Sequence, residues 1–109
     1  MGTLGRLWAG RLSGGNTGRL FAELEDSGSG VIGTIGLHDV AHGVIVFTCA
    51  GRFAAGVLEL TCTPPPPARD GEPGEIRLRG PLQPDESIMG EWMAASGARG
   101  AFVLFPDRR

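Results

Sequence analysis

The stretch Glu75-Ile-Arg-Leu-Arg-Gly-Pro-Leu82 begins with a regular alternation of charged and apolar residues. Successive side chains of a β-strand point to opposite faces, so this period of two predicts a strand with one face on a core and the other in water. The inner face is expected to carry Ile76, Leu78 and Leu82. The charged residues between them are expected to lie outside.

The same alternation recurs along the chain, for example in Val57-Leu-Glu-Leu-Thr-Cys62, where Leu58, Leu60 and Cys62 are expected to point inward. Turn residues return about every 8–12 positions, and glycine interrupts every candidate helix. These features predict strands at residues 4–12, 18–26, 30–37, 43–50, 56–63, 75–82, 87–95 and 100–106. Short connections join antiparallel neighbours. We therefore predict an all-β fold, an eight-stranded antiparallel up-and-down meander closed into a small barrel, with residues 1–109 as one domain.

Nineteen of the 109 residues are glycine, which is high for a globular protein. The glycines do not recur at every third position, which excludes collagen, and a hydrophobic content of 41% with a net charge of −2 argues against disorder. Most glycines fall at predicted turns. Those inside strands are expected where a curved sheet needs relief from crowding. Gly90 is predicted to share a face with Trp92 and to make room for its indole.

All ten basic residues are arginine, and only Arg108 and Arg109 are adjacent. A nucleic-acid binder normally carries a basic stripe, and a membrane-surface anchor a basic cluster, so neither partner is expected. No apolar run approaches the roughly 18 residues of a membrane helix, and no charged-then-apolar start resembles a signal peptide. A cytoplasmic location is the resulting expectation.

The two cysteines, Cys49 and Cys62, are expected to be reduced and buried. If Gly51 pairs with Gly56 across the predicted turn, the two cysteines lie four residues apart along their strands. That offset is about 13 Å, whereas a disulfide needs Cα atoms within about 7 Å.

No segment carries a strong signal for catalysis, a metal or a cofactor. The cluster His38-Asp-Val-Ala-His42 falls between two strands and supplies too few ligands, so a solvated turn is expected there. The glycine-rich segment around Asn16 lacks the lysine of a phosphate-binding loop and is predicted to be a hairpin turn. The sequence also lacks the G-x-S-x-G elbow of a serine hydrolase. We predict no catalytic residue, no metal ligand and no cofactor.

The segment Ile88-Met-Gly-Glu-Trp-Met, followed by Gly97-Ala-Arg-Gly-Ala-Phe-Val-Leu-Phe, resembles the G-x-W strand, glycine turn and return strand of calycin-type barrels, the avidin-like and lipocalin-like proteins. The resemblance implies a ligand cavity at the open end of the barrel and, in many members, oligomer formation. In lipocalins the G-x-W strand comes first, whereas here it is the seventh. This interpretation makes the protein a binder of a small apolar ligand, with a site formed by Trp8, Trp92, Phe102 and Thr34.

The predicted outer surface favours a different function. Strands seven and eight place four apolar side chains outward, Met89, Met93, Val103 and Phe105, and such patches often mark interfaces. Bulky inward residues should also fill most of an eight-stranded lumen. The favoured hypothesis is a non-enzymatic interaction or assembly module that self-associates or docks on a protein through these strands. A barrel isomerase or hydrolase ranks third, since its inward polar groups would be limited to Thr34, Thr48 and the loop histidines.

Overall fold

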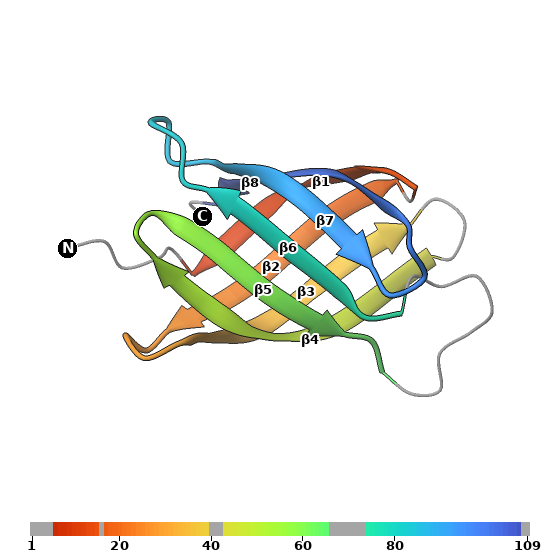
Figure 1. Ribbon diagram of the computed structural model, residues 1–109, viewed down its shortest axis with the longest axis horizontal. Helices are drawn as coiled ribbons and strands as arrows, with labels where there is room; N and C mark the ends of the chain where they lie inside the picture. Colours follow the sequence, from red (N-terminus) through yellow and green to blue (C-terminus); the bar gives the residue numbers. More distant parts are fainter. Residues whose placement is uncertain (1–5, 16, 40–42, 66–73, 108–109) are drawn as a thin grey trace.

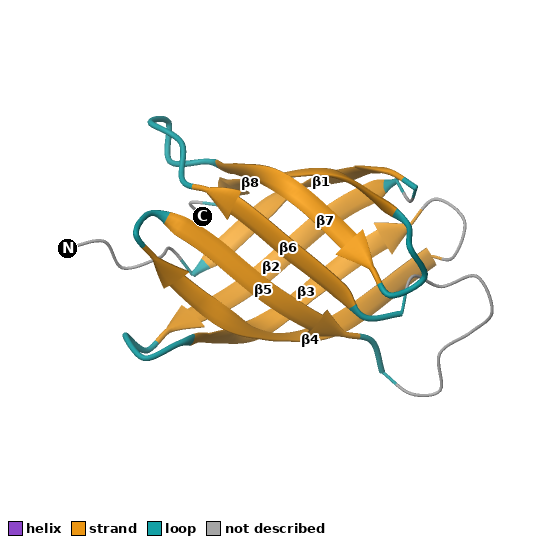
Figure 2. Cartoon of the chain, in the orientation of Figure 1, coloured by secondary structure: helices purple, strands orange, loops and turns teal. Residues whose placement is uncertain are grey.

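The computed structural model of the chain describes residues 6–15, 17–39, 43–65 and 74–107. Eight antiparallel strands in sequence order form one closed barrel (Figure 1). Their bounds are β1 Leu7–Gly14, β2 Gly18–Asp26, β3 Val31–Asp39, β4 Gly43–Ala54, β5 Val57–Thr63, β6 Ile76–Pro81, β7 Ile88–Ala94 and β8 Arg99–Pro106. Figure 2 shows only strands and loops in these ranges. The predicted fold class and up-and-down topology are confirmed.

The barrel closes where β8 pairs with β1, from Trp8 opposite Pro106 to Gly14 opposite Gly100. This seam joins the first strand to the last, so every described strand has a hydrogen-bonded neighbour on both sides. Closure leaves the sheet without an edge on which another chain could add a strand. Recognition by this barrel therefore depends on its lumen, its loops or the outer faces of its strands.

The lumen is filled by the inward residues of the alternating strands. As predicted, bulky inward residues fill it, and the following are all buried: Trp8, Leu24, Ile35, Phe47, Leu60, Leu78, Trp92 and Phe102. Leu82, predicted to face inward together with Ile76 and Leu78, is instead 41% exposed. Strand β6 ends at Pro81, and the alternation ends with it. Leu82 enters the β6–β7 loop, where its N–H donates to the carbonyl of Gly56.

The β4–β5 hairpin differs from the prediction and changes the state of the cysteines. Its loop is only Ala55 and Gly56, with φ of 54° and 76°, between the paired residues Ala54 and Val57. A two-residue turn with both φ angles positive matches the twist of the flanking strands. Because the turn is this short, β4 continues to Ala54, four residues beyond its predicted end at residue 50. In this register Cys49 lies directly opposite Cys62, and the two form a disulfide with Cα atoms 4.0 Å apart. The prediction of reduced thiols was wrong because the turn was taken to be wider.

Glycines inside strands lie where neighbouring backbones come very close. A Cβ on Gly90 would overlap the carbonyl oxygen of Arg79 on β6, so Gly90 relieves a backbone contact and not, as predicted, an indole. The indole of Trp92 lies instead next to Gly100. Trp92 pairs with Gly100 on β8, yet its Nε1–H donates to the carbonyl of Ser13 on β1 at 2.8 Å. The ring therefore crosses β8 at a position that has no side chain and joins β7 to β1.

Candidate functional site

The lumen holds three of the four residues expected to bind a small ligand. Trp8, Trp92 and Phe102 are each at most 3% exposed and belong to one hydrophobic core. Thr34 does not join them. It is exposed on the outer face of β3, opposite Glu23 and Thr48, because its neighbour Ile35 points inward and successive residues of a strand face opposite sides.

The inward polar groups required by an enzyme in the lumen are also missing from the expected positions. Thr48 and His38 are exposed on the outer face, and His42 lies outside the described residues. Among the described residues, the buried polar or charged ones are Asp39, at the end of β3, and Ser87, just before β7. No buried side-chain nitrogen or oxygen in the described ranges lacks a hydrogen-bond partner. In these ranges the lumen therefore presents no unsatisfied side-chain polar atom to a ligand.

Ser87 is a buried polar residue that the sequence analysis did not single out, and it organises the β6–β7 loop. Its hydroxyl donates to Asp85 Oδ1 at 2.6 Å and its N–H donates to the same oxygen at 3.0 Å. The hydroxyl, followed by the N–H, lowers the pKa of the Asp85 carboxyl below its ordinary value because both donors stabilise its ionised form. This is a structural Asx-type turn at one end of the barrel.

A metal site finds no support in the described part of the chain. No group of three His, Cys, Asp or Glu residues there is arranged to hold an ion. The same ranges contain no helix long and apolar enough to cross a membrane.

The predicted interface residues lie on the outside of β7 and β8. Met89, Met93 and Phe105 are exposed, and Val103 is half-buried. Met89 and Val103 are direct cross-strand neighbours. Met93 lies apart from them, between Arg77 and Arg99 in register, with Glu91 between it and Met89 on the strand.

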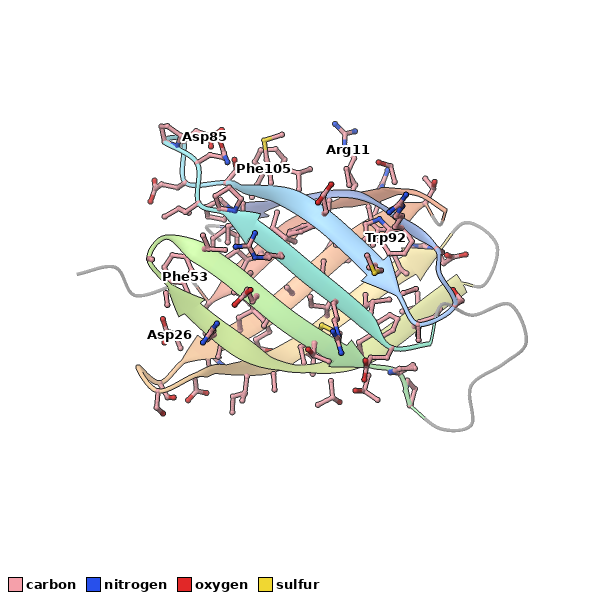
Figure 3. All side chains as sticks on the ribbon, viewed as in Figure 1. Arg11, Asp26, Phe53, Asp85, Trp92 and Phe105 are labelled. Carbon is pink, nitrogen blue, oxygen red and sulfur yellow. A yellow bond between two sulfur atoms is a disulfide. The ribbon has the colours of Figure 1, made fainter. Side chains whose placement is uncertain are left out.

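The apolar surface instead continues in the other direction around the barrel. Phe105 pairs with Ala9 on β1, and Ala9 pairs with Phe21 on β2, which is 49% exposed. We call Met89, Val103, Phe105, Ala9 and Phe21 the apolar face. It crosses β7, β8, β1 and β2 without a charged residue, and Figure 3 shows Phe105 on the outer side of the ribbon. Its extension across the seam depends on the register of β8 against β1, which the alternation of apolar residues does not determine.

A basic row borders the apolar face. Val103 pairs with Arg11 on β1, Arg11 with Arg19 on β2, and Arg19 with His38 on β3. The three basic residues are exposed, and Figure 3 shows Arg11 directed away from the barrel. In the sequence these residues are scattered, so the basic row is a product of the strand register.

The opposite side of the barrel carries charges of alternating sign. Glu59 on β5 accepts hydrogen bonds from Arg52 Nε at 3.0 Å and Arg79 Nε at 3.1 Å. These two guanidinium groups, Arg52 first, lower the pKa of the Glu59 carboxyl below its ordinary value. In register the row continues from Arg79 to Glu91 on β7. Here the arginines are engaged with acids, whereas the side chains of Arg11 and Arg19 make no hydrogen bond or ion pair within the described ranges.

Next to this charged ladder, a groove of about 550 Å³ lies over β6, β7 and β8. Its walls carry the side chains of Arg77, Arg79, Glu91, Met93 and Arg99, and Gly100 and Ala101 form part of its base. The groove is open to solvent and amphipathic, with three guanidinium groups around a thioether. Met93, predicted to be part of an apolar interface, therefore lies beside arginines that the sequence pattern does not place next to it.

Searches against protein families, curated proteins and solved structures found no match to this chain. The arrangement of its surfaces and lumen is therefore the basis for the function proposed below.

Proposed function

We propose that the protein is a non-enzymatic interaction module that docks through the outer faces of its last two strands, with a second copy of the chain as the partner. The observation that carries this proposal is the apolar face. Isolated exposed hydrophobic residues are ordinary on soluble proteins, but a continuous apolar surface over neighbouring strands is typical of interfaces. Here that surface includes two exposed aromatic rings, Phe21 and Phe105, separated only by Ala9.

The small side chain of Ala9 helps to explain why this face suits a protein partner. Phe105 and Phe21 flank Ala9 in register on β8 and β2, so two rings stand on either side of a shallow position. Aromatic anchors beside a shallow recess are features from which protein interfaces gain most of their binding energy. An isologous dimer would bury both pairs of rings against each other.

Packing of the lumen supports docking over the alternative, a barrel that binds a small apolar ligand as calycin-type proteins do. Trp8, Trp92 and Phe102 occupy the space that such a ligand would need. The calycin-like alternative would require these side chains to move apart. An enzyme in the lumen, the third hypothesis, would further require polar groups where Thr34 and Thr48 instead face outward.

Light scattering and sedimentation at micromolar concentration test the proposal. We expect the wild type to be a dimer and Phe105→Glu to be a monomer, because a carboxylate at the centre of the interface would be buried without a partner. Ile32→Glu is the matched control, since Ile32 is also exposed on a strand but lies outside the apolar face. A monomeric wild type overturns the self-association proposal, as does an equal loss of the dimer in both variants.

A further inference from the structure

We propose that the groove over β6, β7 and β8 is a binding site for a small organic anion, a carboxylate or sulfonate carried on a flat apolar body. The proposal goes beyond self-association and does not depend on it. It rests on the shape of the groove, on the state of its arginines and on the position of Met93.

The shape of the groove follows from residues that the barrel requires. Gly100 is in register with the inward Trp92, so it presents only backbone atoms to the outer groove. Its neighbour Ala101 contributes only a methyl group to the outer face. Long side chains from β6 and β7 stand beside these two small residues, so a hollow of about 550 Å³ forms between them. That volume lies within the range of small-molecule sites, which is roughly 300–1,000 Å³.

The charges of the groove favour an anion. Three arginines and one glutamate line it, so its formal charge is 3 − 1 = +2. Arg79 is bonded to Glu59, and Arg77 has only a loose pairing with Glu75, at 3.9 Å between Nε and Oε1. The guanidinium group of Arg99 makes no hydrogen bond or ion pair within the described part of the chain. Arg77 and Arg99 therefore offer guanidinium donors for an incoming anion.

The register places an apolar contact between these two donors. Met93 lies directly between Arg77 on β6 and Arg99 on β8, and its side chain is 54% exposed. A guanidinium group binds a carboxylate or sulfonate through parallel N–H bonds, and a thioether packs well against an aromatic ring. An anion bound by either arginine would bring its apolar body over Met93. Simple inorganic anions would leave that contact unused.

Binding of 8-anilinonaphthalene-1-sulfonate, followed by its fluorescence, tests the proposal on the full-length protein. The uncharged analogue N-phenyl-1-naphthylamine has the same aromatic body without the sulfonate. We expect the double variant Arg77→Ser/Arg99→Ser to weaken sulfonate binding about tenfold or more, since charge-assisted hydrogen bonds from guanidinium groups are stronger than neutral ones. Binding of the uncharged analogue should not change.

The control double variant is Arg11→Ser/Arg19→Ser, which removes two exposed arginines from the basic row, outside the groove. It should bind the sulfonate as the wild type does, and the emission of the buried tryptophans reports that each variant is folded. Equal weakening in both doubles would overturn the site, and so would absence of sulfonate binding by the wild type. If Arg77→Ser/Arg99→Ser weakens binding of the uncharged analogue as strongly as binding of the sulfonate, the probes bind through non-specific apolar contacts and the anion site is overturned.

Phe105→Glu separates this proposal from the proposed function. Phe105 does not line the groove, so this variant should still bind the sulfonate while it loses self-association. A monomeric wild type that binds the sulfonate in the expected manner would remove the assembly proposal and leave the anion site in place. A dimer without sulfonate binding would do the reverse.

Discussion

Reduction of the Cys49–Cys62 disulfide should destabilise the barrel substantially while leaving its strand order unchanged. The two cysteines are 13 residues apart and face each other across β4 and β5. Cross-linking a loop of this size lowers the entropy of the unfolded chain by an amount worth about 3 kcal/mol at 25 °C. For a domain of this length, that change corresponds to a fall in melting temperature of roughly 10–20 °C.

Urea unfolding, followed by tryptophan fluorescence, measures the effect with and without reductant. Both tryptophans are buried, so their emission reports the loss of the core. The double variant Cys49→Ala/Cys62→Ala is the control. It should unfold close to the reduced wild type, and its stability should not respond to reductant.

Thiol titration after treatment with oxidised glutathione provides the refuting result. If the folded wild type keeps two free thiols, Cys49 and Cys62 are not cross-strand partners and the turn at Ala55–Gly56 is wrong. If the disulfide forms but reduction changes the unfolding free energy by less than about 0.5 kcal/mol, the loop-entropy reasoning fails. The reducing cytosol keeps most protein thiols unpaired. Alkylation of the protein in its own cells therefore also tests the expected cytoplasmic location.

Three further perturbations test the local geometry. Gly33→Ala should destabilise or unfold the protein, because the new Cβ would overlap the carbonyl oxygen of Glu23. Gly36→Ala on the same strand should be tolerated, since the atom nearest to its new Cβ, the carbonyl oxygen of Phe21, would be 3.8 Å away. Thermal unfolding of the two variants measures the difference. Ala55→Asn should raise the unfolding free energy by about 0.5–1 kcal/mol, because asparagine tolerates the positive φ of this turn better than alanine, and an unchanged or lower value in urea would contradict the turn assignment. The lowered pKa of Glu59 means that its contribution to stability is present above its ordinary pKa of 4.5 and is lost as pH falls through the lower folded value. Glu59→Gln should therefore reduce the loss of stability between neutral and acidic pH, and identical pH profiles for variant and wild type would count against the Arg52–Glu59–Arg79 bonding.

Strand count and facing were predictable because they depend on local properties. A period of two in residues such as Ile76 and Leu78 identifies which side of the strand packs inward, whatever its neighbours are. The same argument correctly placed Trp92 and Phe102 in the core. It failed at Leu82, because β6 ends at Pro81 and a residue beyond the strand need not follow the alternation of the two sheet faces.

Register was not predictable from the same pattern. Moving the β4–β5 turn from a four-residue loop to Ala55–Gly56 shifts every pair by an even number of residues, so each side chain keeps its face. The pattern of buried residues is therefore the same in the two registers. The four-residue loop would separate Cys49 from Cys62, whereas the two-residue loop places them opposite each other. The choice rests on backbone conformation at Ala55, where a positive φ is uncommon for alanine.

By itself, the sequence determined that this chain is a closed all-β meander with an apolar interior, because hydrophobic period and turn spacing are properties of short segments. Tertiary structure decided which outer residues meet. Arg11 lies beside Val103, and Arg77 and Arg99 flank Met93, only because a specific register is maintained around the whole barrel. A site assembled from several strands depends on all the turns between them and on the closing seam. For that reason the apolar face and the anion groove emerged only in three dimensions.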